Sequence, residues 1–358
     1  MFVVSLIHTP IIFSRKNAAS LECNYELAIN GKPSRLLRLF RLRQSGTMQS
    51  RLPRFKRAPT VAPMLLMERD RQIIRLIHRH RFLRSHQIIA LLGGSPQHLL
   101  RRLKLLYHHG YLERPRAQID YYHQGGSSHI IYGLGNKSWM FLKQELGDDF
   151  HELSWGEKNR AVGRIFLEHA LLVSDVMVSL ELACRKHDGI GLRYEDQLAL
   201  HSEQQPFQWR VKTRSGIRLG VIPDRIFALE YTDQNGQLER VHFFLEADRG
   251  TMPVVRSGLT QTSFYRKLLA YEATWTQKIH QRHLGVHRFR VLTVTTVAAR
   301  VKSLLEACSQ LKRGHGLFLF ADRTVLEKDP FSAVWRRGKS SDTAGILDLP
   351  EMASRPVS

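Results

Sequence analysis

Apolar residues recur at helical spacing in three short, consecutive stretches, and the first of them begins at Met67. The second stretch begins at Ser85 and ends at Gly93-Gly94, because serine favours a helix N-cap and glycine favours a helix C-terminus. The third begins at Ser95-Pro96, since proline suits the first helical position. The pattern predicts three helices that share one apolar core. Their apolar stripes are Ile73, Ile74 and Ile77; Ile88, Ile89, Leu91 and Leu92; and Leu99, Leu103 and Leu106.

A strand and a hairpin are predicted after the third helix. Gly110 to Leu112 ends the helix and begins a strand, and Ile130 to Leu134 reads as a strand after the turn-rich segment from His123 to His129. This order resembles a winged helix-turn-helix, in which the third helix enters the major groove of duplex DNA. Alternatively, the basic helix face is only solvated, or the wing mediates dimerisation. The residues predicted to contact DNA are Gln97, His98, Arg101, Arg102 and Lys104 on the helix, and Gln124 and His129 on the wing.

The rest of the chain alternates helical and strand patterns, which predicts an α+β protein whose second domain contains a mixed α/β sheet. The predicted order is helix 158–185, strands within 192–200, 218–231 and 241–248, helix 259–283, strand 289–297, helix 298–311 and strand 317–320. We expect four regions: a poorly ordered basic extension over 1–66, the winged helix over 67–142, the α/β domain over 143–335 and a disordered tail over 336–358.

The chain is strongly basic, with a formal net charge of +22 and a pI near 10.3. Such a charge attracts polyanions, so DNA is the expected partner, and anionic membrane is the competing one. No apolar run approaches the roughly 18 residues of a spanning helix, and we expect no membrane span. The three cysteines are widely spaced, which fits neither a disulfide framework nor a zinc site. The cytoplasm is the simplest compartment.

The basic extension leaves the start of the natural chain open. Met1 to Phe13 is apolar but lacks the positive n-region and cleavage site of a secretory signal. Ser34 to Arg43 could form a basic amphipathic helix for phosphate or lipid, or remain a basic tail. Met48, which precedes the basic stretch from Arg51 to Arg57, is an alternative start to Met1.

Three acidic residues are the candidate chemical groups. Asp224 follows Pro223 in a turn between two predicted strands, and Glu246 and Asp248 lie on the next strand. Side chains alternate across a strand, so Glu246 and Asp248 share one face, and a hairpin could place Asp224 beside them. Such a cluster would suit Mg²⁺, which prefers oxygen ligands. Alternatively, these acids lie on the surface, where Pro-Asp turns and acidic strand ends are common.

The arrangement resembles the PD-(D/E)xK nuclease core, in which two acids and a lysine act together. The lysine expected two residues after Glu246 is absent, because Asp248 occupies that position. The resemblance makes Asp224 and Glu246 the metal ligands and Asp248 a third ligand. Lys267, on the next predicted helix, is the candidate that replaces the missing lysine. Glu168 is a candidate outer ligand, whereas His169 beside it reads as a hydrogen-bonded core residue.

The segments together resemble the replication-relaxation family over roughly Glu68 to Trp335. The most specific piece is Phe244 to Thr251, and Glu168-His169, Pro223-Asp224 and Asp329-Pro330-Phe331 contribute. The resemblance implies association with mobile elements, plasmid replication and DNA relaxation, with replication or relaxase proteins as further partners.

Three functions compete on these grounds. The first is a DNA-binding accessory protein of plasmid or mobile-element replication and relaxation, whose winged helix contacts duplex DNA. The second is a Mg²⁺-dependent DNA nuclease that nicks DNA with Asp224, Glu246, Asp248 and Lys267. The third is a winged-helix transcriptional regulator, which would recognise a single preferred operator.

Overall fold

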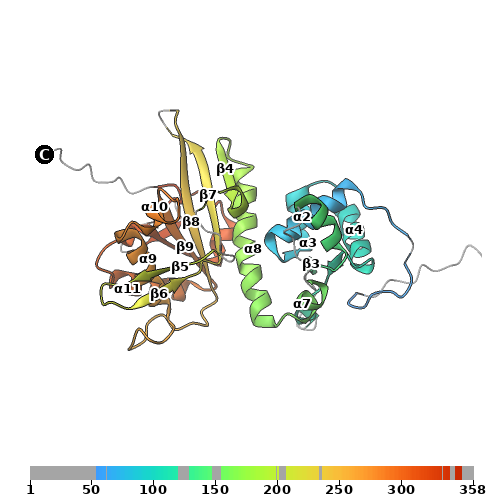
Figure 1. Cartoon of the computed structure of the whole chain (residues 1–358). Helices are drawn as coiled ribbons and strands as arrows, with labels where there is room; N and C mark the ends of the chain where they lie inside the picture. Colours follow the sequence, from blue (N-terminus) through green and yellow to red (C-terminus); the bar gives the residue numbers. More distant parts are fainter. Residues whose placement is uncertain are drawn as a thin grey trace, which may run out of the picture. The chain divides into compact units, whose positions relative to one another are not determined.

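The computed structural model describes residues 54–61, 63–119, 129–146, 155–198, 200, 207–233, 236–332, 334–338 and 343–348. All belong to the compact unit that spans Pro53–Ser358. The described part is an α+β protein with a three-stranded, a two-stranded and a mixed seven-stranded sheet (Figure 1). The expected basic helix at 34–43 and the choice between Met1 and Met48 lie outside these residues. None of the described helices is long and apolar enough to cross a membrane.

Residues 68–119 and 129–134 form a unit that we call the front module. Its three predicted helices are confirmed, and their apolar stripes meet in one core together with Leu112, Tyr132 and Leu134. A short antiparallel sheet in the order β1-β3-β2 closes this core. The elements are α2 (Glu68–His80), β1 (Leu83–Arg84), α3 (Ser85–Leu92), α4 (Pro96–His108), β2 (Leu112–Glu113), a 3-10 helix (Arg116–Gln118) and β3 (Ile131–Leu134), and α6 (Ser138–Leu146) follows the module.

A buried acid joins α2 to α4. Asp70 is fully buried, and its carboxylate accepts a 2.9 Å hydrogen bond from the backbone N–H of Met67, which caps the start of α2. The same carboxylate accepts a 2.9 Å hydrogen bond from Nε of Arg102 on α4. A buried carboxylate needs such partners, because desolvation penalises an unpaired charge. Arg102 therefore fixes the position of α4 against α2.

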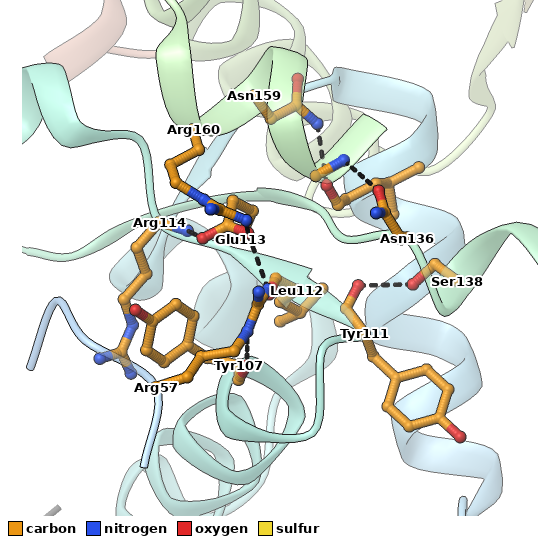
Figure 2. Close-up of polar contacts among 12 residues, drawn as sticks. Arg57, Tyr107, Tyr111, Leu112, Glu113, Arg114, Asn136, Ser138, Asn159 and Arg160 are labelled. Carbon is orange, nitrogen blue, oxygen red and sulfur yellow. Dashed lines mark hydrogen bonds and ion pairs between the residues drawn. The ribbon is translucent and has the colours of Figure 1, made fainter. Parts of the chain in front are cut away.

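The segment before α2 is bound to the front module (Figure 2). Arg57 donates from Nε to the carbonyl of Tyr107 at 3.0 Å and pairs with Glu113 at 2.7 Å. The backbone N–H of Ala58 donates to Nδ1 of His108 at 3.1 Å. Arg160, on α7 (Trp155–Ala161), reaches the same Glu113 at 3.3 Å. Residues 54–61 thus belong to the fold, which differs from the expected poorly ordered extension up to residue 66.

The second half of the chain is built around the seven-stranded sheet, whose order is β12-β11-β10-β9-β8-β7-β4. β8 lies antiparallel to β7 and parallel to β9, so the predicted mixed sheet is confirmed. The elements are α8 (Arg164–Cys184), β4 (Ile190–Tyr194), β5 (Trp209–Lys212), β6 (Arg218–Val221), β7 (Arg225–Thr232), β8 (Leu238–Asp248), α9 (Phe264–Thr276), α10 (Ile279–Arg282), β9 (Phe289–Thr295), α11 (Ala298–Ser309), β10 (Phe318–Asp322), β11 (Trp335–Arg337) and β12 (Thr343–Ala344). Three further 3-10 helices are Glu195–Gln197, His315–Leu317 and Arg323–Glu327.

Helices cover both faces of this sheet (Figure 1). Phe243 and Leu245 point to the face covered by α8, and they share an apolar core with Val176 and Leu180 of that helix. Phe244 points to the opposite face, where α9 and α11 pack. The alternation along β8 therefore decides which side chains meet which helices.

Several predicted elements differ from the structure for local reasons. The single helix expected over 158–185 is two helices, because Gly163 adopts an extended conformation before α8. The helix expected over 259–283 is broken at Lys278, whose φ of 54° is left-handed. The strand expected to reach Leu200 ends at Tyr194, where the side chain of Gln197 accepts the Tyr194 N–H at 3.0 Å and a 3-10 turn begins.

Two strand assignments also change. The strands predicted on either side of the Pro223-Asp224 turn lie in different sheets, because β6 pairs with β5, which was not predicted, in a separate two-stranded sheet. The large sheet continues past Trp335 through β11 and β12, and Ile346 is fully buried. A disordered tail was expected from residue 336, but β12 and Ile346 belong to the sheet and the core. These strands are too short to give a periodic signal.

We predict that Asp70→Ala lowers the free energy of unfolding by about 2 to 4 kcal/mol, because it removes the cap of α2 and leaves Arg102 without its buried partner. Urea unfolding measures this change. Glu68→Ala on the same helix is the control, since Glu68 forms surface pairs with Arg71 and Arg75 and such pairs contribute about 0.5 kcal/mol. Equal effects for the two variants would contradict the role of Asp70.

Candidate functional site

The pairing of β7 with β8 places Asp224 opposite Glu246. Arg225 lies across from Leu245 in the antiparallel ladder, and the backbone N–H of Asp224 donates to the Leu245 carbonyl at 3.0 Å. Asp224 thus continues the register by one residue beyond β7. Its Oδ2 also accepts a 2.7 Å hydrogen bond from the backbone N–H of Ala247. The predicted hairpin therefore brings the two acids together.

Glu246 is almost completely buried, at 1% exposure, and two side chains of α9 bind its carboxylate. Lys267 bonds to Oε2 through its ammonium group, and the Tyr271 hydroxyl donates to Oε1 at 2.6 Å. Burial raises the pKa of Glu246 against the effect of the Lys267 charge. The carboxylates of Glu246 and Asp224 outweigh desolvation and raise the pKa of Lys267. Burial and Glu246 raise the pKa of Tyr271, so its phenol stays protonated and donates.

Asp248 shares a face with Glu246, as the alternation predicts, but it has a different partner. Nε of Arg300, on α11, donates to Oδ2 of Asp248 at 2.6 Å. The backbone N–H of Gly250 donates to Oδ1 at 3.1 Å. Both side chains of this ion pair are largely buried, with exposures of 6% for Asp248 and 14% for Arg300. The pair attaches the end of β8 to α11.

His169 on α8 contacts Asp224. Its Nε2 lies 3.1 Å from Oδ1, and this hydrogen bond raises the pKa of the imidazole. Burial alone would raise the pKa of Asp224, but the hydrogen bond from His169 and the Lys267 charge together lower it. Asp224 is therefore held as a carboxylate between a histidine and a lysine.

The described residues contain no group of three or more His, Cys, Asp or Glu side chains arranged to hold a metal ion. Asp224 and Glu246 are nevertheless adjacent carboxylates. Mg²⁺ is commonly held in proteins by one or two carboxylates and completes its coordination with water. These two residues are the ones that could hold it, with Lys267 as the neighbouring cation.

The residues predicted to contact DNA differ in their exposure and in their partners. Gln97, His98 and Arg101 are exposed on α4, and Lys104 is half-buried on the same helix. Arg102 is instead paired with Asp70. His129 is exposed, and its ring lies 4.2 Å from that of His86, centroid to centroid. Gln124 lies outside the described residues.

A cavity of about 890 Å³ lies along α8, and its lining includes residues of α3. Its charged side chains largely pair with one another. Arg84 and Arg323 both reach Asp175, and Arg249 pairs with Glu168. The cavity therefore has a mixed, internally balanced charge rather than a surplus of one sign.

Sequence reasoning missed some of these contacts. Arg300 was not selected, because no local pattern links it to an acid 52 residues earlier in the chain. His169 was expected to be a core residue, yet it contacts the candidate acid. The helical spacing of Arg266, Lys267, Tyr271 and Lys278 predicts a basic helix face that is solvated or follows the DNA backbone. This is wrong for Tyr271, whose side chain is fully buried. Glu168 binds Arg164 and Arg249.

We predict that Lys267→Met lowers the free energy of unfolding at pH 8 by about 3 kcal/mol, because it leaves a buried carboxylate without its cation. The loss should shrink at pH 5. A Glu246 pKa raised above its unfolded value means that the folded state binds the extra proton, so stability rises as pH falls toward the unfolded pKa. Urea unfolding at both pH values measures this.

The matched control is Lys267→Met in a Glu246→Gln background, where no carboxylate remains. We expect the additional loss there to be below about 1 kcal/mol. An undiminished loss in that background would show that Lys267 stabilises the fold through its hydrocarbon stem rather than through Glu246.

Comparison with known proteins identifies one family. A family model described as replication-relaxation matches residues 74–289, from α2 through the start of β9, and this range includes Asp224, Glu246, Asp248 and Lys267. A search of curated proteins and a search of solved structures each found no match. The family match covers more than half of the 358 residues. The chain belongs to the replication-relaxation family.

Proposed function

We propose that this protein is a DNA-binding accessory protein of replication and relaxation, and that its front module binds duplex DNA as a winged helix. Family membership supports a role in replication or relaxation. The observation that carries the proposal is the division of α4 into two faces. Leu99, Leu103 and Leu106 are buried, whereas Gln97, His98 and Arg101 are exposed at the N-terminal half of the helix.

The N-terminal half of a recognition helix is the part that reaches base edges in helix-turn-helix proteins. Gln97 can bond adenine and Arg101 can bond guanine or phosphate at such a position. Lys104, one turn further along, would contact the backbone. The net charge of +22 supplies the general attraction to phosphates. Replication or relaxase proteins are the proposed protein partners, and a plasmid or mobile element is the proposed DNA.

We predict that Arg101→Ala combined with Lys104→Ala weakens duplex binding about tenfold or more at 100 mM salt and reduces the slope of log K against log salt by about 1 to 2. Fluorescence anisotropy with a labelled duplex over a salt series measures both. Arg210→Ala combined with Lys212→Ala is the control, because it removes the same charge from exposed positions of β5.

The control should change affinity less than threefold. If both pairs weaken binding equally, the attraction depends on net charge alone, and α4 is not the recognition helix. A single strongly preferred sequence among many duplexes would instead favour a transcriptional regulator.

Metal-dependent DNA cleavage is the second candidate function, and the contact between Lys267 and Glu246 favours it. The PD-(D/E)xK core needs two acids and a lysine, and Lys267 approaches the acids from α9 although it is far from them in sequence. We propose that Asp224 and Glu246 would hold Mg²⁺, which lowers the pKa of a bound water. Lys267 would then neutralise charge at the scissile phosphate. Asp248, paired with Arg300, would orient the strand end or supply a third ligand.

If this protein cleaves DNA, we predict that it converts supercoiled plasmid to the nicked form in Mg²⁺ or Mn²⁺. Asp224→Ala and Glu246→Ala should each abolish the nicked product. Chelator should also abolish it. Glu239→Ala is the control, because Glu239 lies at the other end of β8 and pairs with Arg288. Agarose gels read the outcome. Intact but retarded plasmid with all four proteins would rule out cleavage and leave the DNA-binding function.

A further inference from the structure

Helix α8 carries an exposed aromatic ring near the histidine that contacts the candidate acid Asp224. Phe166 on α8 is 40% exposed although it is a large apolar side chain. It precedes His169 by three residues, so the two lie on neighbouring positions of the helix surface. His169 in turn bonds Asp224. Ile165, at 71% exposure, and Ile222, at 51%, are exposed beside these residues in sequence.

An arginine lies over the Phe166 ring. The guanidinium carbon of Arg81 is 4.5 Å from the ring centroid, within the range of a cation–π contact. Arg81 is exposed and forms no ion pair within the part of the chain that the structure describes. Its φ of 66° is left-handed, which is rare for a residue other than glycine and costs conformational energy. Arg81 therefore combines an uncommon backbone conformation with a guanidinium group over the ring.

Charged residues also lie near Phe166 along the first turn of α8. Arg164 is 52% exposed, and Arg249 donates from its guanidinium to the carbonyl of Ile165 at 2.9 Å. Glu168 pairs with both arginines and offsets part of their charge. Arg81 is not offset in this way. An exposed aromatic ring with a cation over it and further arginines on the same helix turn matches a single strand, which presents both base faces and phosphates.

The geometry points to a stacking platform, formed by Arg81 and Phe166 with the exposed Ile165 next to Phe166 on α8, that binds an unpaired base of single-stranded DNA. Bases in a duplex are stacked on one another and expose only their edges, so an aromatic face can stack only on an unpaired base. Proteins usually bind single strands by stacking aromatic rings on bases and by placing cationic side chains against the phosphates. This inference goes beyond the duplex contact of α4 and does not depend on cleavage.

The test compares two labelled 20-nucleotide strands, oligo-dT and a fully abasic strand with the same phosphates, by fluorescence anisotropy with the full chain. Wild type should bind oligo-dT more tightly than the abasic strand. Phe166→Ala should lower the oligo-dT affinity about tenfold, as expected for the loss of one stacked base, and leave the abasic affinity unchanged. Phe166→Trp should preserve the preference for oligo-dT.

Two controls make the result specific. Phe166→Leu keeps an apolar side chain without a ring, and it should behave as Phe166→Ala; wild-type affinity in this variant would overturn stacking. Trp275→Ala removes an aromatic side chain of matching exposure, 39%, from α9 and should leave both affinities unchanged. Equal affinity of wild type for the two strands would also overturn the platform.

Duplex binding and light scattering separate the remaining outcomes. Phe166→Ala should bind duplex DNA as wild type does, so loss of the platform is distinguishable from loss of the proposed function of α4. If Phe166→Ala changes the mass of the protein in solution while its oligo-dT affinity stays at the wild-type value, the surface contacts a second copy of the chain, and the proposal is wrong.

Discussion

The antiparallel register between β7 and β8 determines where every acid of the candidate site lies. With Arg225 opposite Leu245, Asp224 falls opposite Glu246, and Glu246 and Asp248 face α9 and α11. A slip of one residue would turn both acids toward α8, into a core that now holds Phe243 and Leu245. Each acid would then lose its cation in an apolar environment, which costs far more than a lost hydrogen bond. The two apolar cores therefore fix the register, and the register fixes the chemistry.

The net charge overstates the cationic surface that can meet DNA. Arg102 and Arg300 neutralise the buried acids Asp70 and Asp248. Arg114 and Arg290 are 4% and 2% exposed, and burial lowers the pKa of Arg290 to about 10. These guanidinium groups hold the fold together through directional hydrogen bonds. The net charge includes these buried arginines on the same footing as the exposed Arg101. Only an exposed cation can displace counterions from phosphate.

Sequence patterns predicted the parts of this structure that depend on neighbours in the chain. The helices of the front module follow from apolar spacing, and the shared face of Glu246 and Asp248 follows from the period of a strand. Lys267 was selected because it lies on the helix predicted after β8 and could replace the lysine that the nuclease motif lacks. Contacts between distant segments gave no such signal. His169 meets Asp224 across 55 residues, and no residue type that favours positive φ marks Lys278, where the predicted helix is broken. β12 was missed because two residues have no period.

Helix α8 contacts both the front module and the candidate acid Asp224. Its Ser174 hydroxyl donates to the His80 carbonyl of α2 at 2.9 Å, and Asp175 accepts a 2.7 Å hydrogen bond from Gln87 of α3. Six residues before Asp175, His169 holds Asp224. Six residues of helix span about 9 Å and behave as a rigid segment. The same rigid helix therefore carries the contacts with the front module and the His169–Asp224 hydrogen bond. That bond lowers the pKa of Asp224 against the effect of burial, so the helix that packs on the front module also favours the ionised form of the candidate acid.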